Sequence, residues 1–135
     1  MATFKKFNSF VEAVAEKVHN LGSDSLVVAL TNSAPLATNT KLTDLTEIAY
    51  TNLSSRAITT TSSAQTSGTY KLVLQDLTLT ASGAVGPFRY VVVYNDTAAG
   101  KELICYYDYG SEITLANGDT FKIDFDDSGG VLTLA

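Results

Sequence analysis

The sequence predicts a mainly β protein, an antiparallel β-sandwich or jelly-roll-like domain that is preceded by one N-terminal α-helix. Three observations predict this. After Gly22 the apolar residues recur with a period of two, in short runs typical of half-buried strands. Turn-forming residues separate these runs at regular intervals. The chain of 135 residues has the common size of one domain, so we expect a single domain over 1–135, with the helix or arm in 1–22 and the sandwich in 23–135.

The helix is predicted from the spacing of apolar side chains in the first 22 residues. They recur at steps of three and four residues, which makes one stripe along a helix: Phe4, Phe7, Val11, Val14 and Val18. Gly22 is expected to end the helix, because glycine is the residue that most often follows a helix C-terminus. Such a helix is not stable alone in water, so we expect it to pack on the sheet or on a neighbour.

The strands are predicted from alternation and from apolar runs. Residues 25–31 form the first, and 88–94 is apolar on both faces, which predicts a central strand. Residues 103–109 form another apolar run. Between 70 and 79 the leucines alternate in two opposite phases, which predicts a β-bulge near Gln75-Asp76.

The last part of the chain contains the strongest turn signal. Asn117-Gly118 predicts a tight hairpin between 112–115 and a strand in which Phe121, Ile123 and Phe125 face the core. Residues 131–134 are the last predicted strand.

Two polar stretches are less regular. The segment 32–55 is rich in Thr, Asn and Asp and is long for a structureless connection, so we expect a functional loop or an arm there. The segment 58–67 is almost entirely Thr and Ser, which fits either a polar strand or a flexible loop.

Charge and composition exclude several classes of function. The net charge of −5 and nine scattered Lys and Arg residues give no basic patch that would neutralise phosphates, so we expect no nucleic-acid partner. No apolar run reaches the length of a membrane span, and no signal peptide is recognised, so we expect no membrane partner. The single cysteine, Cys105, lies in an apolar run and is expected to be a buried small hydrophobe.

The candidate chemical groups each favour a structural role. His19 is the only histidine and accompanies no nucleophile motif. Asp124, Asp126 and Asp127 precede Gly129 but lack the glutamate that completes an EF-hand calcium loop, so a solvated turn is favoured over a looser calcium site. Asp108 lies among tyrosines and is expected to be a hydrogen-bond partner and not half of a glycosidase pair. We therefore expect no enzyme activity, no cofactor and no metal.

Several ordered blocks of sequence resemble a family of small structural proteins from tailed bacteriophages. The N-terminal blocks are EKVHNLGSD (16–24) and LVVALTN (26–32), followed by TEIA (46–49). The later blocks are GPFRYVVVYNDT (86–97) and YDYGSEITLANGDTF (107–121). The resemblance spans most of the chain and implies a place in a virion.

Within that family, the expected role is a head decoration or cement protein. Such a protein binds the outside of the capsid, reinforces contacts between capsomers, and has the major capsid protein as its partner. A homo-oligomer, dimer or trimer, is expected, made in the host cytoplasm and located on the capsid surface. The candidate contacts are the helix, the segment 32–55 and, by residue, Phe4, Lys5 and Phe7. The alternative is a tail- or fibre-associated virion protein that binds a receptor or a carbohydrate.

Overall fold

The computed structural model describes residues 2–135 as ten strands, one α-helix and one 3₁₀ turn. The helix α1 is Ser9–Ala15 and the 3₁₀ turn η1 is Leu42–Asp44. The strands are β1 (Thr3–Lys6), β2 (Leu26–Thr31), β3 (Ala57–Ile58), β4 (Thr60–Thr66), β5 (Thr69–Leu74), β6 (Leu77–Thr80), β7 (Val85–Asn95), β8 (Leu103–Leu115), β9 (Thr120–Ile123) and β10 (Leu132–Leu134).

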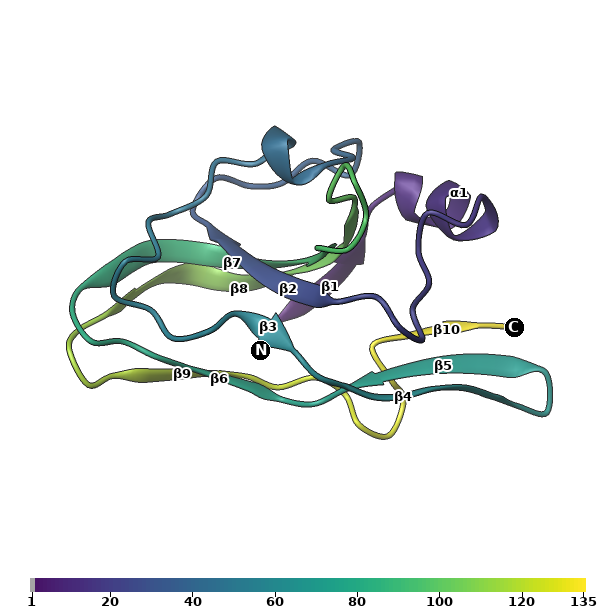
Figure 1. The fold of residues 1–135 in the computed structure, drawn as a ribbon. Helices are drawn as coiled ribbons and strands as arrows, with labels where there is room; N and C mark the ends of the chain where they lie inside the picture. The colour runs from purple at the N-terminus through teal and green to yellow at the C-terminus, as the bar shows by residue number, and fades with distance from the viewer. Residues whose placement is uncertain (1) are drawn as a thin grey trace.

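The strands form two layers. One layer is a five-stranded sheet in the order β1-β8-β7-β2-β3. The other contains a three-stranded sheet, β10-β5-β4, and the pair β6-β9 (Figure 1). All the pairings between these strands are antiparallel. The prediction of a mainly β, antiparallel, sandwich-like domain with one helix is therefore confirmed.

The main core lies between the two layers. Alternate residues of β2, Leu26, Val28 and Leu30, face it from the five-stranded sheet, and Leu72 and Leu74 of β5 join them in one buried cluster. The predicted central strand, β7, is paired on both sides, with β8 and with β2. Its sequence is apolar on both faces because both are buried: Val91 and Val93 lie in the main core, and Val92 and Tyr94 lie in a second cluster on the other face.

The outer face of the five-stranded sheet is buried as well. A second apolar cluster on this face contains Phe7, Ala29, Val92, Tyr94 and others, and Leu42 and Leu45 pack against it. In Figure 1 the first part of the segment 32–55, which carries η1, runs over this face of the sheet. Ile48, Tyr50 and Leu53, from the second part, pack against the main core instead. The stretch for which the sequence predicted a loop or an arm therefore covers the sheet only in part.

The N-terminal prediction was wrong in its details. Residues 3–6 are not helical but form the edge strand β1, in which Phe4 is opposite Tyr107 of β8. The helix is only seven residues long and ends near Glu16, well before Gly22. Lys17 follows with a φ of 66°, a left-handed conformation that cannot continue a helix.

Three strand predictions also need correction. Asn117-Gly118 does not close a paired hairpin, because β8 pairs with β7 while β9 pairs with β6. The phase change near Gln75-Asp76 is not a bulge within one strand, because the chain leaves the three-stranded sheet there and enters the two-stranded sheet. Residues 103–115 form one continuous strand, β8, with Gly110 at a φ of 84°.

The structure also shows what becomes of the Ser/Thr-rich stretch and of the alternating residues 121–125. The Ser/Thr-rich stretch forms the polar strand β4. Phe121, Ile123 and Phe125 lie inward of the exposed Lys122 and Asp124, as the alternation predicted. Within residues 2–135, none of the helical segments has both the length and the apolar character needed to cross a membrane.

Candidate functional site

Exposed apolar side chains gather around the helix. Among residues 2–135, four of the five large hydrophobic side chains that are exposed lie on α1, directly after it, or on the edge strands β1 and β10. Their exposed fractions are 41% for Phe4, 52% for Val11, 37% for Val18 and 41% for Leu134. We call the surface formed by these four residues the α1 surface.

Two hollows make the α1 surface continuous. One, of about 400 Å³, lies between β1, α1 and β10 and is lined by Phe4, Val11 and Leu134, among others. The other, of about 590 Å³, includes Val18 and again Leu134. Because Leu134 lines both hollows, the four exposed side chains belong to one neighbourhood of the molecule.

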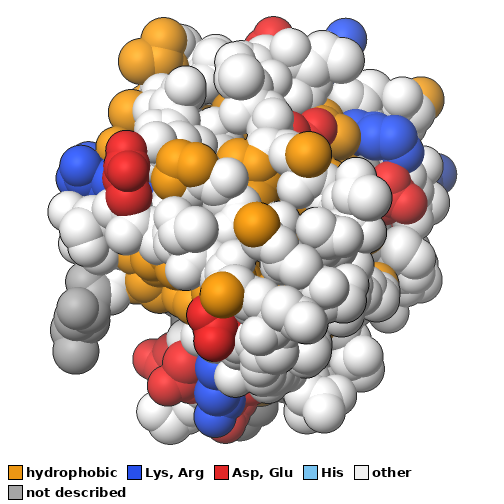
Figure 2. Space-filling model, turned by 90° about the vertical axis from the view of Figure 1, so that its left-hand side faces the viewer, with side chains coloured by type: hydrophobic (Ala, Val, Ile, Leu, Met, Phe, Trp, Pro, Cys, Tyr) orange, Lys and Arg blue, Asp and Glu red, His pale blue; other side chains and the backbone are white. Residues whose placement is uncertain are grey.

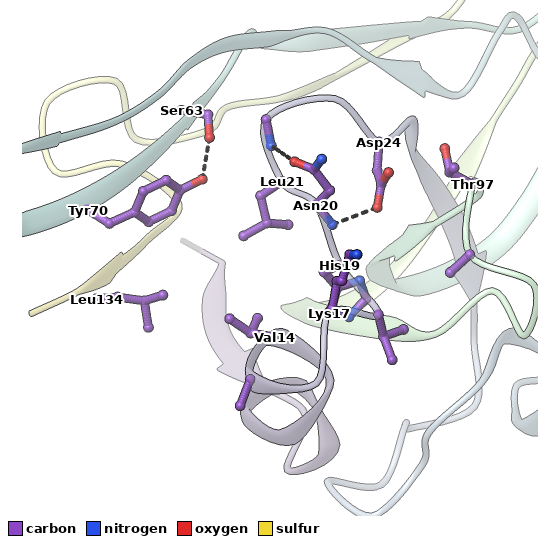
Figure 3. A pocket seen from close by; sticks show the side chains of 14 residues that line it. Val14, Lys17, His19, Asn20, Leu21, Asp24, Ser63, Tyr70, Thr97 and Leu134 are labelled. Carbon is purple, nitrogen blue, oxygen red and sulfur yellow. Dashed lines mark hydrogen bonds between the residues drawn. The ribbon is translucent and has the colours of Figure 1, made fainter.

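The larger hollow is an open end of the sandwich. Figure 3 shows Tyr70 and Leu134, from β5 and β10, on one side, and Val14 and Leu21, from α1 and the segment after it, on the other. The hydroxyl of Tyr70 is hydrogen-bonded to that of Ser63 of β4 over 2.6 Å. The two layers separate here, so Val14 and Tyr70 remain half-buried and Leu134 is exposed, whereas Leu21 is buried.

The local structure explains why these apolar side chains are at the surface. The strand β1 has only four residues and lies at the sheet edge, so Phe4 covers Tyr107 on one side only, with ring centroids 5.5 Å apart. The helix is held by Phe10, which is buried in the main core. Val11, the next residue along the helix, turns outward as a consequence.

The three residues expected at an interface do not lie together on the surface. Phe4 and Lys5 are exposed, whereas the side chain of Phe7 is fully buried in the outer cluster, 5.2 Å between ring centroids from Tyr106. Phe4 and Lys5 also point to opposite faces of the sheet, since neighbours in a strand alternate. Only Phe4 of the three is part of the α1 surface.

His19 lies beneath the larger hollow in a buried polar cluster. Asn95, which is fully buried, donates from Nδ2 to Nδ1 of His19 (2.9 Å) and to Oδ2 of Asp24 (2.6 Å). Its Oδ1 accepts from the backbone N–H groups of Thr97 (3.0 Å) and Ala98 (3.2 Å). One amide thus joins the segment after α1, the approach to β2 and the turn between β7 and β8.

The ionisation of His19 is set mainly by burial. Because Nδ1 accepts from Asn95, the proton of the neutral ring lies on Nε2, which is buried and has no hydrogen-bond partner within the described residues. Burial lowers the pKa of His19, while the carboxylates of Glu102 and Asp24 oppose this effect. The ring of Phe10 lies 5.5 Å from the imidazole. In this arrangement His19 connects the segment that follows the helix to Asn95, at the end of β7.

Asp108 forms an ion pair with Arg89. Its two carboxylate oxygens accept from Nε and Nη2 of Arg89, over 2.8 Å and 3.2 Å, and Oδ1 also accepts from the N–H of Gly110. The hydrogen bonds from Arg89 lower the pKa of Asp108, and that from Gly110 adds to this. This is the hydrogen-bonding role that the sequence favoured.

The acidic residues near Gly129 lie at a third hollow, of about 750 Å³, whose lining includes Tyr107, Tyr109 and Phe125. Asp126 is committed to its own turn, because Oδ1 accepts from the N–H groups of Ser128 and Gly129. Among residues 2–135, no group of three or more His, Cys, Asp or Glu residues is arranged to hold a metal ion.

Sequence reasoning missed the main features of these sites. The sequence pattern assigns Leu134 to a strand and Val11 to the helix with no distinct role, and it gives Asn95 no distinct role either. A usable signal for Asn95 was its position directly after the most apolar run of the chain, where a polar side chain requires partners.

Comparison of the chain with protein-family models, with curated proteins and with solved structures gives no match.

Proposed function

We propose that this chain is a non-enzymatic virion structural protein that binds the outside of a phage capsid and reinforces contacts between capsomers. The single observation that carries the proposal is the α1 surface, where Phe4, Val11, Val18 and Leu134 are exposed in one neighbourhood. An exposed apolar cluster of this kind gains free energy when a partner covers it. The partner in this proposal is the major capsid protein.

The rest of the surface suits extensive contact. Charged residues make up 17% of the chain, against about 25% in typical globular proteins. Figure 2 shows one face on which charged side chains form a few separate groups, mostly near the edges, among neutral and hydrophobic atoms. Neutral hydroxyl and amide groups lose less on leaving water than charged groups do, so such a surface is covered at low cost. The sequence blocks that resemble phage structural proteins agree with this role.

The mechanism requires packing and no bond chemistry. A capsid repeats the same boundary between subunits many times, and a small protein seated across that boundary adds buried area to both neighbours. Covering a half-exposed valine or leucine contributes about 1 kcal/mol. The four residues of the α1 surface would together stabilise each contact by a few kcal/mol, at about 1 kcal/mol for each side chain that is covered.

The test is rebinding of purified protein to particles that lack it. Asp in place of Val11 or Leu134 puts a charge where an apolar contact forms, so Val11→Asp and Leu134→Asp should each weaken binding about tenfold or more. Leu36→Asp is the matched control, because Leu36 is 62% exposed, lies in the segment 32–55 and lines neither of the two hollows. It should bind as the unmodified protein does.

The outcomes are distinguishable. Loss of binding by Leu36→Asp, with Leu134→Asp unaffected, would move the contact to the segment 32–55. Binding of the unmodified chain to tails and not to heads would favour the tail- or fibre-associated role instead.

A further inference from the structure

The strand β4 forms an open edge of the second layer. In the order β10-β5-β4 it is outermost, and among residues 2–135 its pairing partner is β5 alone. Figure 1 shows the β4-β5 hairpin extending past the five-stranded sheet, with β10 beside β5 and α1 above them. The outward backbone groups of such a strand are available to another strand.

The hairpin geometry identifies the outward groups. Ser67 and Gly68 both have positive φ, 52° and 86°, as in a two-residue type I′ turn. The pair that flanks the turn, Thr66 and Thr69, therefore exchanges backbone hydrogen bonds, and alternate residues of β4 do the same. It follows that the N–H and C=O groups of Ser63 and Gln65 point away from β5.

This edge lacks the features that keep other edges from pairing. Between Arg56 and Lys71 the sequence has no charged residue and no proline. The one irregularity of β4 lies between Thr60 and Ser62, so residues 62–66 remain a regular run. Lysines, prolines and bulges within a strand are the usual protection of an exposed edge.

The other edges are protected or too short. Self-pairing of β1 would bring Lys5 and Lys6 close to the same residues of the second copy. The edge strand β10 has three residues and β3 has two. The strands of the β6-β9 pair have four residues each, and β9 carries Lys122. Compared with these edges, β4 is the longest uncharged one and the best suited to a second copy.

We propose that two copies of this chain associate through β4, antiparallel about a two-fold axis at Ala64. Ser63 of each copy then lies opposite Gln65 of the other, and these pairs exchange about four backbone hydrogen bonds. The small side chain of Ala64 lies opposite itself at the axis, where strands approach most closely. The two three-stranded sheets become one continuous sheet. Self-association of this kind does not depend on the virion role.

The register is electrostatically compatible with a homodimer. Every cross-strand pair in it, Ser62 with Thr66, Ser63 with Gln65 and Ala64 with itself, is neutral, so no like charges oppose each other. A strand from a different protein could use the same backbone groups, but nothing in β4 selects it over a second copy.

The test is the mass of the protein in solution, by sedimentation equilibrium over a wide concentration range. The unmodified chain should reach the mass of two chains at high concentration. Ala64→Lys brings two charges together at the axis and should raise the dissociation constant about five- to tenfold. Gln65→Pro removes two of the backbone hydrogen bonds of the dimer and should raise it about thirtyfold.

Ala116→Lys is the matched control, because Ala116 is exposed in the turn after β8 and lies outside β4. It should dimerise as the unmodified chain does, and circular dichroism should show all variants folded. In the dimer, the amides of Ser63 and Gln65 should exchange more slowly as the concentration rises. A monomer at every concentration, or a dimer that Ala64→Lys leaves intact, would overturn the proposal.

Discussion

Nδ2 of Asn95 lies 2.9 Å from Nδ1 of His19, although 76 residues separate them in the chain. This contact fixes the segment after α1 to the end of β7, and through it the helix and the α1 surface to the five-stranded sheet. The integrity of that surface therefore depends on a buried polar cluster.

Asn95→Ala should destabilise the protein by about 3 kcal/mol, because it leaves His19, Asp24 and two backbone N–H groups without their buried partner. The measurement is urea-induced unfolding. Asn8→Ala is the control: Asn8 is exposed, its side chain makes no capping bond, and the change should be below about 0.5 kcal/mol. Equal stabilities for the two variants would contradict the role of the cluster.

Stability should fall when the pH is lowered through the range in which His19 titrates. Burial places its pKa in the folded state below the ordinary value of 6.5, so the unfolded chain takes up the proton first. The stabilising contribution of neutral His19 is thus fully present above pH 6.5 and is lost as the pH falls towards the folded-state pKa. The groups that face the ring are Asn95, Glu102 and Asp24, with Phe10 beside it.

The check on this pH dependence is the free energy of unfolding of the unmodified chain and of His19→Gln, measured from pH 8 to pH 5. The variant should show a flatter profile over that range. An unchanged slope in the variant would assign the dependence to other groups.

The helix should depend on Phe10 and not on Val11. Phe10→Ala removes a ring that is buried in the main core and should cost about 3–5 kcal/mol, whereas Val11→Ala changes a half-exposed side chain and should cost less than about 0.5 kcal/mol. Thermal unfolding of both variants measures the difference. If both variants lost a similar amount of stability, the result would support the single apolar stripe along the helix that the sequence predicted.

Gly86 should tolerate no side chain. It has a φ of 111°, and a Cβ built there would lie 2.7 Å from the carbonyl oxygen of Ile113 in β8. Gly86→Ala should therefore cost about 3 kcal/mol. Gly118→Ala, at a φ of 89° but with no heavy atom within 4 Å of the built Cβ, should cost about 1 kcal/mol. Chemical denaturation of the two variants separates the steric clash from the backbone strain.

The strands that the sequence predicted correctly are those in which local pattern and burial agree. Apart from Arg89, the segment 88–94 is apolar because β7 is buried on both faces, in the main core and in the outer cluster. Phe121 and Ile123 of β9, with Phe125 just after it, alternate with exposed residues because only one face is buried. The hydrophobic pattern of each of these strands follows from which of its faces is buried, so the strand is predictable even when its pairing partner is unknown.

The errors occurred where partners decide the structure. Phe4 and Phe7 are spaced as on one face of a helix. Over so few residues, however, the spacing does not distinguish a helix from a strand, and pairing with β8 makes residues 3–6 the strand β1. Asn117-Gly118 forms a turn, yet the pairing of β9 with β6 takes the chain to the other layer. The α1 surface was not predictable, because it depends on where the layers separate.

The most direct test of the proposed function is the number of copies of this chain relative to the major capsid protein, by quantitative mass spectrometry of purified particles. A capsid decoration protein predicts a ratio near one, or a simple fraction of it. A handful of copies per particle would contradict a role over the whole shell and favour the tail or a vertex, and complete absence from particles would contradict the virion role itself.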